Sequence, residues 1–171
     1  MDIVPTRAED IFARHHRDVF RFLARMTGNR DMADDLCQDV FLRVVRALQH
    51  GDPPTHERGW IFAIARHLLI DHRRHRRPGV DPADLRSASV SATQALAYGL
   101  SEALASLPDD HREVFLLREV AGLNYADIAA ACGCSVEAVR SRLSRTRIRL
   151  RTCLEPPRTD TPRRVENDHD T

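Results

Sequence analysis

The sequence of 171 residues contains no lysine and few aromatic side chains. All 26 of its basic residues are arginine, and they face 25 acidic residues, so the formal net charge is only +1. Coding bias in a GC-rich genome is one explanation for an arginine-only chain, and the fit of the guanidinium fork to phosphate and guanine edges is another. Total charge therefore excludes no class of partner, and the distribution of charge along the chain is more informative.

The chain also lacks a long apolar segment. No run approaches the roughly 18 residues that a membrane-spanning helix requires. The first residues, MDIVPTRAED, show no basic-then-apolar secretory pattern. We therefore expect a cytoplasmic protein with reduced cysteines. The cysteines are Cys37, Cys132, Cys134 and Cys153.

No segment shows the alternating apolar pattern of a β-strand, whereas apolar residues recur every three or four positions throughout. This spacing predicts three helices before residue 77, separated by turns at 27–31 and 49–59 that hold glycine, asparagine or proline. Four further helices are expected between residues 95 and 154. The expected fold class is all-α.

A change of composition divides the chain into two parts. Residues 78–94, PGVDPADLRSASVSATQ, are rich in proline and small polar residues, as is typical of linkers. The last residues show no apolar periodicity, which is typical of disorder. We therefore expect two small helical domains joined by a flexible linker. The domains are expected at 7–77 and 96–154, the linker at 78–95 and a disordered tail at 155–171.

The segment YADIAAACGCSVEAVRSRL predicts a helix-turn-helix in the second domain. Ala129 allows two helices to approach closely, and Gly133 supplies the positive φ of a tight turn. Ser135 stands where an N-cap residue belongs, and Val139 fills the crossing between the helices.

The second helix of this motif separates apolar from basic side chains. Its buried stripe is expected to hold Val136, Val139, Leu143 and Leu150. Its other side carries Arg140, Ser141, Ser144, Arg145 and Arg147. Such a helix enters the DNA major groove, where arginine can bond guanine O6 and N7 together and serine reads more loosely. Phosphate contacts are expected from Arg142, Arg149 and Arg151. A basic helix that is merely solvated is the alternative.

The first domain contains an acidic segment, RDMADDLCQDVFLRVV, and a basic segment, WIFAIARHLLIDHRRHRR. Aspartates in a first turn often serve only as complements of the helix dipole. Gln38 and Asp39 lie beyond the first turn, so capping does not explain them. The basic segment suggests a second nucleic-acid contact, and we expect Trp60 within it to belong to the core.

Three motifs in series resemble the extracytoplasmic-function (ECF) group of the sigma-70 family of RNA polymerase sigma factors. They are ADDLCQDVFLRVVRAL, WIFAIARHLLIDHRR and LASLPDDHREVFLLREVAGLNYADIAAACGCSVEAVRSRLSRTRIRLR, and the resemblance covers about residues 8–154. It implies a factor that binds core RNA polymerase and directs initiation by recognising −10 and −35 promoter elements. It also implies an anti-sigma factor as a partner.

The resemblance assigns roles to particular residues. Asp35, Gln38 and Asp39 would bind the β′ clamp of the polymerase, with Arg43 on the rim. The loop at 49–58 would hold unstacked −10 bases together with Arg66, His67, Asp71, Arg73 and Arg74. Residues 96–154 would read the −35 element through Arg140, Ser141, Arg142, Ser144, Arg145, Arg147 and Arg149. Where the family usually has asparagine this chain has His67, and Glu137-Ala138-Val139 replaces the usual Gly-Thr-Val, so both departures bear on promoter sequence.

No catalytic triad, phosphate-binding glycine loop or pair of catalytic carboxylates is present, so we expect no enzyme, no cofactor and no metal. Cys132 and Cys134 are separated by one residue, whereas zinc sites favour wider spacing and four ligands. A redox role for this pair stays open.

The alternatives to a sigma factor are a dimeric helix-turn-helix repressor, an anti-sigma or adaptor protein, and an enzyme. A repressor would leave the acidic helix without a role.

Overall fold

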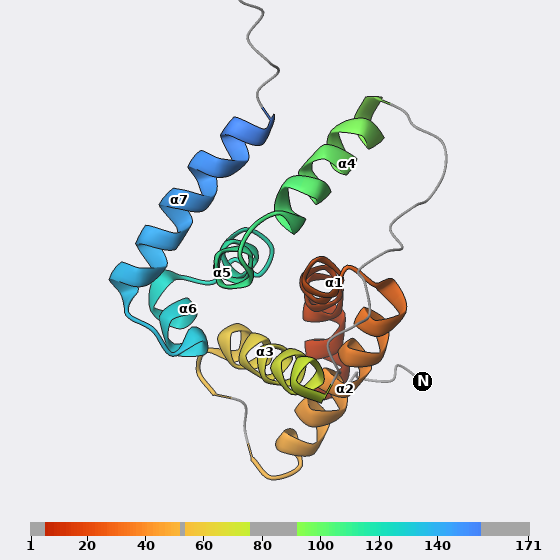
Figure 1. Cartoon of the computed structure of the whole chain (residues 1–171). Coiled ribbons are helices and arrows are strands. Elements are labelled where there is room, and N and C mark those ends of the chain that lie inside the picture. The colour runs from red at the N-terminus through yellow and green to blue at the C-terminus, as the bar shows by residue number, and fades with distance from the viewer. Residues whose placement is uncertain (1–5, 52–53, 76–91, 155–171) are drawn as a thin grey trace, which may run out of the picture.

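The computed structural model describes residues 6–51, 54–75 and 92–154, with the side chains of the last range described from residue 99 (Figure 1). These residues form seven α-helices and no β-strand. The helices are α1 (Arg7–Thr27), α2 (Arg30–Leu48), α3 (Glu57–His75), α4 (Ala92–Ala105), α5 (Asp109–Glu119), α6 (Tyr125–Cys132) and α7 (Val136–Leu154). The all-α prediction is confirmed. None of the described helices is long and apolar enough to cross a bilayer.

The predicted linker and tail fall mainly outside the described residues. Helix α4 begins at Ala92, within the range expected for the linker, and the rest of that range, 78–91, is not described. The tail at 155–171 also lies outside the described residues. The domain boundaries that we expected at these places therefore stay predictions.

Local signals position the first two helices. Thr6 and Glu9 form a capping box before α1, in which the Thr6 N–H donates to Glu9 Oε2 at 2.6 Å. Gly28 ends α1 with φ 68°, a left-handed conformation that suits glycine. Asn29 then caps α2 by accepting the Met32 N–H at 2.9 Å. A turn of two residues therefore places α2 directly against α1.

The first three helices bury their apolar stripes against one another. Val19 and Phe22 of α1 and Ile61 and Phe62 of α3 are fully buried. The rings of Phe22 and Phe62 meet edge to face, with centroids 5.6 Å apart, which is a favourable aromatic geometry. Trp60 is partly buried and packs against this core, as expected.

The last four helices form the second half of the molecule, in which α7 packs against α4, α5 and α6. The apolar spacing of the sequence predicts a buried face of α5 that holds Val114, Phe115, Leu117 and Val120. Val114 and Leu117 are buried, but Leu116 takes the place expected for Phe115, and both Phe115 and Val120 are only partly buried. A helix with four consecutive apolar residues leaves the exact orientation of its buried face to its neighbours, and this part of the prediction was wrong.

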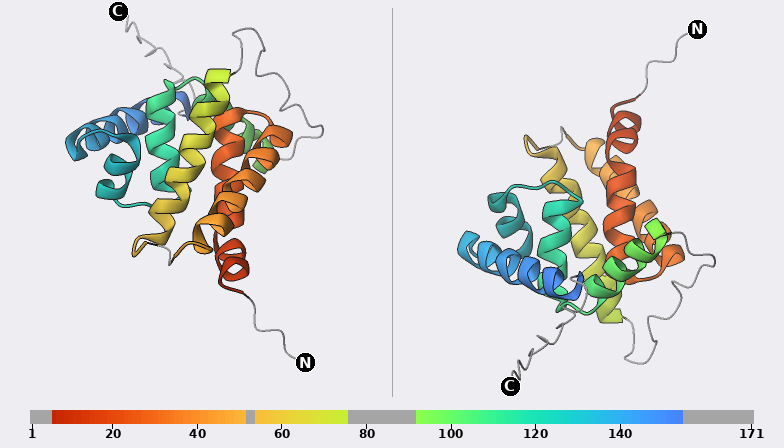
Figure 2. Two further views of the ribbon diagram at one scale, coloured as in Figure 1. Left: turned by 90° about the horizontal axis from the view of Figure 1, so that it is seen from below. Right: turned by 90° about the horizontal axis from the view of Figure 1, so that it is seen from above.

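The two halves lie against each other. Helix α3 packs against α6, and α1 packs against α5 (Figure 2). Both views in Figure 2 place α5 alongside α3, and the two helices run in opposite directions. The basic third helix of the first half is therefore covered on one side by the second half.

Candidate nucleic-acid interface

The predicted helix-turn-helix is formed by α6 and α7. Gly133 ends α6 with φ 62°, and its N–H donates to the carbonyls at the end of that helix. Ser135 Oγ accepts the Ala138 N–H at 3.1 Å and so caps α7. Val139 is fully buried and Ala129 is 7% exposed, so the crossing between the helices is closed as predicted.

One face of α7 is buried and the opposite face is exposed. Val139, Leu143 and Leu150 lie inside, as predicted, whereas Val136 is only partly buried. Thr146, which the sequence pattern missed, also lies inside. Thr146 is completely buried, and its hydroxyl lies 3.4 Å from His111 Nδ1. The exposed face carries Arg140, Ser141, Ser144, Arg145, Arg147 and Arg149. The fold thus presents six of the seven predicted −35 residues on one accessible surface.

Two arginines of α7 are engaged by acids of α5. Arg142 is only half-exposed, and its Nε lies 3.1 Å from Asp110 Oδ2. Arg147 donates to Glu119 Oε1 at 3.0 Å, and this bond raises the pKa of Arg147. Both pairs are accessible to water, so each contributes little stability. Arg142 differs from the others because part of its side chain packs inside.

Arg140 takes part in an aromatic contact at the start of α7. Its guanidinium lies 5.9 Å from the centre of the Tyr125 ring, and that of Arg118 lies 5.3 Å from the same ring. Such contacts restrict a long side chain without neutralising its charge. Arg140 is therefore partly preorganised at the N-terminal end of α7.

The residues assigned to the −10 element fall on two faces of α3. His67, Asp71 and Arg74 are exposed and lie three or four residues apart, so they share one face. Arg66 and Arg73 lie on another face, toward the second half of the molecule. Each of these two arginines forms an ion pair with α5, at 3.0 Å and 2.8 Å respectively. The structure therefore does not bring the five residues together on one free surface.

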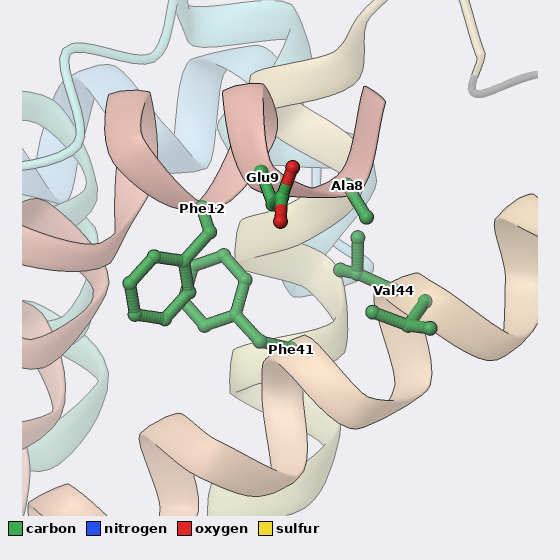
Figure 3. Close-up of a pocket in the computed structure, with 6 residues that line it drawn as sticks. Ala8, Glu9, Phe12, Phe41 and Val44 are labelled. Carbon is green, nitrogen blue, oxygen red and sulfur yellow. The ribbon is translucent and has the colours of Figure 1, made fainter. Parts of the chain in front are cut away.

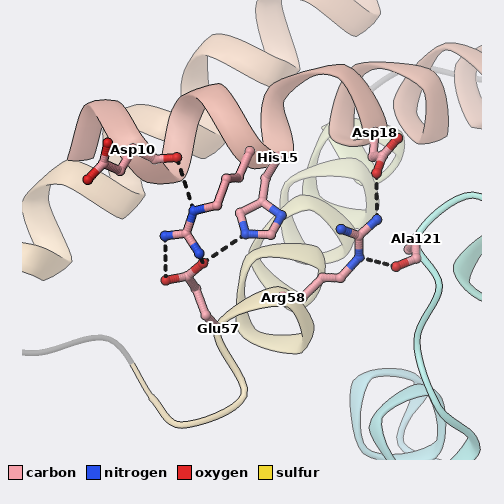
Figure 4. A network of polar contacts seen from close by, with 7 residues as sticks. Asp10, His15, Asp18, Glu57, Arg58 and Ala121 are labelled. Carbon is pink, nitrogen blue, oxygen red and sulfur yellow. Dashed lines mark hydrogen bonds and ion pairs between the residues drawn. The ribbon is translucent and has the colours of Figure 1, made fainter. Parts of the chain in front are cut away.

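A polar network fixes the start of α3 and the end of the loop before it (Figure 4). His15 is buried on α1, and its Nε2 lies 2.8 Å from Glu57 Oε1. Arg14 adds a second contact to the same carboxylate at 3.0 Å. Arg58 binds Asp18 at 2.5 Å and also donates to the carbonyl of Ala121. These contacts hold the first turn of α3 against α1.

The predicted polymerase-binding residues lie on the exposed face of α2. Asp35, Gln38, Asp39 and Arg43 are all exposed. Gln38 donates to Asp34 Oδ2 at 3.1 Å, which orients its side chain along the acidic surface. The helix therefore exposes carboxylates over more than one turn.

Exposed apolar side chains continue this surface toward the end of α2. Leu42 is 53% exposed and Val45 is 39% exposed, and Phe12 of α1 is 47% exposed. Phe12 and Phe41 meet edge to face, with centroids 4.9 Å apart, beside a shallow groove (Figure 3). The groove is lined by Ala8, Glu9, Phe12, Phe41, Val44 and Val45. The apolar spacing of this segment predicts Phe12 on the buried face of α1, and its exposure shows that this prediction was wrong.

The cysteine pair lies between the helices of the second half. Burial, and then the nearby Glu113 carboxylate, raise the pKa of Cys132 to about 12, so its thiol is protonated at neutral pH. Cys134 lies 3.7 Å from a guanidinium nitrogen of Arg142. Within the described parts of the chain, no three His, Cys, Asp or Glu side chains form a group suited to a metal ion.

The acids of α5 are the functional candidates that sequence reasoning missed. Glu113 is only 9% exposed, and Asp109 opens the same helix. The available signal was the position of Glu113, which lies four residues before the buried Leu117 and so shares its apolar face. A carboxylate on an apolar face requires a partner, and here Arg66 supplies it.

Two family models match the chain in the order of its halves. Sigma-70 region 2 matches residues 11–78, and Sigma-70, region 4 matches residues 99–150. The chain is 38% identical over 148 residues to the ECF RNA polymerase sigma factor SigC of Mycobacterium tuberculosis, covering 82% of this chain and 79% of that protein. It is 34% identical over 139 residues to the ECF RNA polymerase sigma factor EcfG of Rhodopseudomonas palustris, and the match covers 78% of this chain and 77% of that protein.

Solved structures give the same result for the fold. CnrH, solved in complex with the cytosolic domain of CnrY, is 29% identical with a TM-score of 0.65, and the match covers 86% of each chain. The sigma factor RpoE from Bartonella quintana, solved with the anti-sigma factor NepR, is 24% identical with a TM-score of 0.68, covering 88% of this chain and 98% of that one.

Proposed function

Because the chain belongs to the ECF group of the sigma-70 family of RNA polymerase sigma factors, we propose how its helices divide the work of such a factor. The chain binds core RNA polymerase and directs promoter-specific initiation through −10 and −35 elements. The proposal concerns the residues that perform each step. The observation that carries it is that an acidic surface lies on α2, whereas the arginine-bearing surfaces lie on α3 and α7.

Helix α7 reads the −35 element as duplex DNA. The exposed Arg140 and Arg145 bond guanine edges in the major groove, while Ser141 and Ser144 make looser contacts with bases or phosphate. Arg142, Arg147 and Arg149 contact the backbone and make binding salt-dependent. Residues 96–154 form the domain that carries this surface.

Residues 7–77 form the domain that opens the −10 element. Opening requires that contacts with the captured bases compensate for the lost stacking free energy, which is about 1.4 kcal/mol per base-pair step. His67, Asp71 and Arg74 form the exposed part of the capture surface on α3. Arg66 and Arg73 complete it. The loop at 49–58, of which residues 52 and 53 lie outside the described residues, is assigned to the same step.

Helix α2 binds the polymerase. Asp35, Gln38 and Asp39 face a basic helical segment of the β′ subunit, and Arg43 lies on the rim of the contact. Their exposure and the acid-to-apolar order along α2 support this assignment, because a mixed surface suits a partner helix with both kinds of side chain.

We propose further that the factor works in the cytoplasm without a catalytic activity of its own, and that an anti-sigma factor controls it. The support for such a partner is the resemblance to CnrH and RpoE, both solved in complex with a second protein.

Binding to core polymerase tests the assignment of α2. The wild-type chain and the Glu102→Arg variant, a matched charge reversal on the exposed face of α4, should co-elute with core polymerase in size-exclusion chromatography. The Asp39→Arg variant should lose most of this binding while keeping the helical circular dichroism of the wild type. Equal co-elution of Asp39→Arg and wild type would contradict the assignment.

A further inference from the structure

We infer that Tyr125, which lies on α6 and not on α7, is a positioning residue for −35 recognition, because its ring holds Arg140 in place before DNA binds. The inference rests on the proposed role of α7 and adds a residue of the preceding helix to the determinants of specificity. Tyr125 does not have to touch a base. It acts through the arginine beside it.

Arg140 is restrained by a contact that leaves its hydrogen-bond donors free. Its guanidinium lies 5.9 Å from the centre of the Tyr125 ring, and it forms no hydrogen bond or ion pair with any described residue. A cation–π contact restrains the side chain without neutralising its charge. The N–H donors of arginine are the groups that bond guanine O6 and N7. Arg140 is therefore held in place and still available to a base.

The ring has a fixed position because the backbone that carries it is capped. Tyr125 is the first residue of α6, directly after the N-cap Asn124. Asn124 Oδ1 accepts the Asp127 N–H at 2.8 Å, and Asn124 Nδ2 donates to Asp127 Oδ2 at 2.8 Å. Helix α6 packs against both α5 and α7 (Figure 1), and Tyr125 is partly buried against the core. The ring is therefore a stable support for a side chain of α7.

A second arginine restrains the same ring from α5. The guanidinium of Arg118 lies 5.3 Å from the centre of the Tyr125 ring. Arg118 also donates to the carbonyl of Leu123 at 2.8 Å, which fixes its position near the end of α5. Tyr125 thus joins three helices near the start of α7, with Arg140 as the exposed member of the group.

The other arginines of α7 do not share this arrangement. Arg142 and Arg147 pair with carboxylates of α5, so some of their donors are occupied. Arg145 is exposed and has no such contact with any described residue, so nothing restrains it. Arg140 is therefore the arginine of α7 that combines restraint with free donors, and Arg145 serves as an internal reference on the same helix.

The expected effect is local and modest. An arginine loses side-chain conformational freedom when it binds a base, and restraint before binding reduces that loss. An exposed cation–π contact corresponds to about a two- to fivefold change in an equilibrium constant. Removal of the ring should therefore weaken recognition of the base pair that Arg140 reads by about this factor. Recognition of the pair that Arg145 reads should not change.

The mobility of the Arg140 side chain in the free chain tests the positioning without DNA. The order parameter of each arginine Nε–Hε bond is measured by ¹⁵N relaxation, and the variants Arg140→Lys and Arg145→Lys identify the two signals. In the wild type the order parameter should be higher for Arg140 than for Arg145. Tyr125→Leu should lower it to the value of Arg145, whereas Tyr125→Phe, which keeps the ring, should preserve it. Equal order parameters of the two arginines in the wild type would overturn the inference.

Selection by holoenzyme from promoter duplexes with a randomised −35 element tests the consequence for base reading. Arg140→Ala identifies the base pair that this arginine reads. Tyr125→Leu should relax the preference at that pair by about two- to fivefold, and Tyr125→Phe should retain it. Adding Tyr125→Leu to Arg140→Ala should cause no further relaxation there, because the ring then has no arginine to position.

Phe115→Leu controls for the loss of aromatic packing. Phe115 is a partly buried aromatic residue of the same half, and no cation–π contact joins its ring to a described arginine. A destabilised second half weakens binding at every base pair alike, so this variant should change no preference. Equal loss of preference at the pairs read by Arg140 and Arg145 in Tyr125→Leu would show that Tyr125 is merely structural, and would overturn the inference.

The two assays distinguish failure of this inference from failure of the proposed function. If Arg140→Ala relaxes a base pair and Tyr125→Leu does not, or if Tyr125→Leu binds more tightly, the inference is overturned and the reading of bases by α7 stands. If Arg140→Ala changes no preference, the proposed role of Arg140 is contradicted. The order parameter of Arg140 then decides by itself whether Tyr125 positions it.

Discussion

Replacing Arg145 by alanine should relax the reading of one base pair in the −35 element without unfolding α7. Arg145 is exposed, and its side chain forms no ion pair with any described residue. Surface substitutions of this kind usually change stability by less than about 0.5 kcal/mol. The measured loss would therefore belong to DNA binding.

The magnitude follows from the contact that an arginine can make in the major groove. A bidentate contact with guanine contributes about 1–3 kcal/mol of discrimination, which is about a 5- to 150-fold change in affinity. A contact with phosphate would instead reduce the slope of log affinity against log salt by about 0.9, with no change of base preference. The two outcomes are distinguishable in one titration.

The assay uses holoenzyme on a pool of promoter duplexes with a randomised −35 element. Bound duplexes are sequenced for the wild type, for Arg145→Ala and for a control, Arg21→Ala, which removes the same charge from the exposed surface of α1. The wild type and the control should select the same element. Arg145→Ala should accept any base at one position and keep its preference elsewhere.

The reasoning fails if Arg145→Ala selects the same bases with the same affinity as the wild type. Arg140→Ala provides a second test, because that arginine is oriented by Tyr125 and should specify a different position. Unchanged selection by both variants would mean that this face of α7 does not read bases.

Two further predictions concern the turn and the thiols. Gly133→Ala should destabilise the fold by about 1 kcal/mol and lower the melting temperature by about 2–4 °C, because φ is 62° there although space for a Cβ is open. Gly51→Ala should not lower the melting temperature, because no left-handed φ is required there. Equal melting temperatures of the two variants would contradict the argument from φ. In alkylation at pH 8, Cys153 should react first, and Cys37 and Cys132 should react slowly because their pKa is raised to about 12. Raising the pH should accelerate the slow pair, and equal rates at pH 8 would refute the burial argument.

Much of the helix-turn-helix was predictable because its signals are local. Gly133 and Ser135 act within one turn of the chain, and each adopts the conformation that its residue type favours. The burial of Val139 follows from the same short spacing. Local conformational preference and tertiary packing agree here, so the sequence was sufficient to predict the helix-turn-helix.

The contacts between the halves could not be predicted in this way. Arg66 and Glu113 are 47 residues apart, and the pattern around each shows only a charge near an apolar stripe. The choice of partner depends on how two helices pack, which periodicity alone does not specify. The exposure of Phe12 and the burial of Leu116 have the same cause, since an apolar run of neighbouring residues leaves the rotation of a helix undetermined.

Mapping of transcription start sites tests the central claim most directly. Core polymerase transcribes sheared genomic DNA of the source bacterium with and without the purified chain, and the 5′ ends of the RNA are sequenced. We predict new start sites that share one sequence element about 10 and another about 35 base pairs upstream. The same set of 5′ ends with and without the chain would contradict the account.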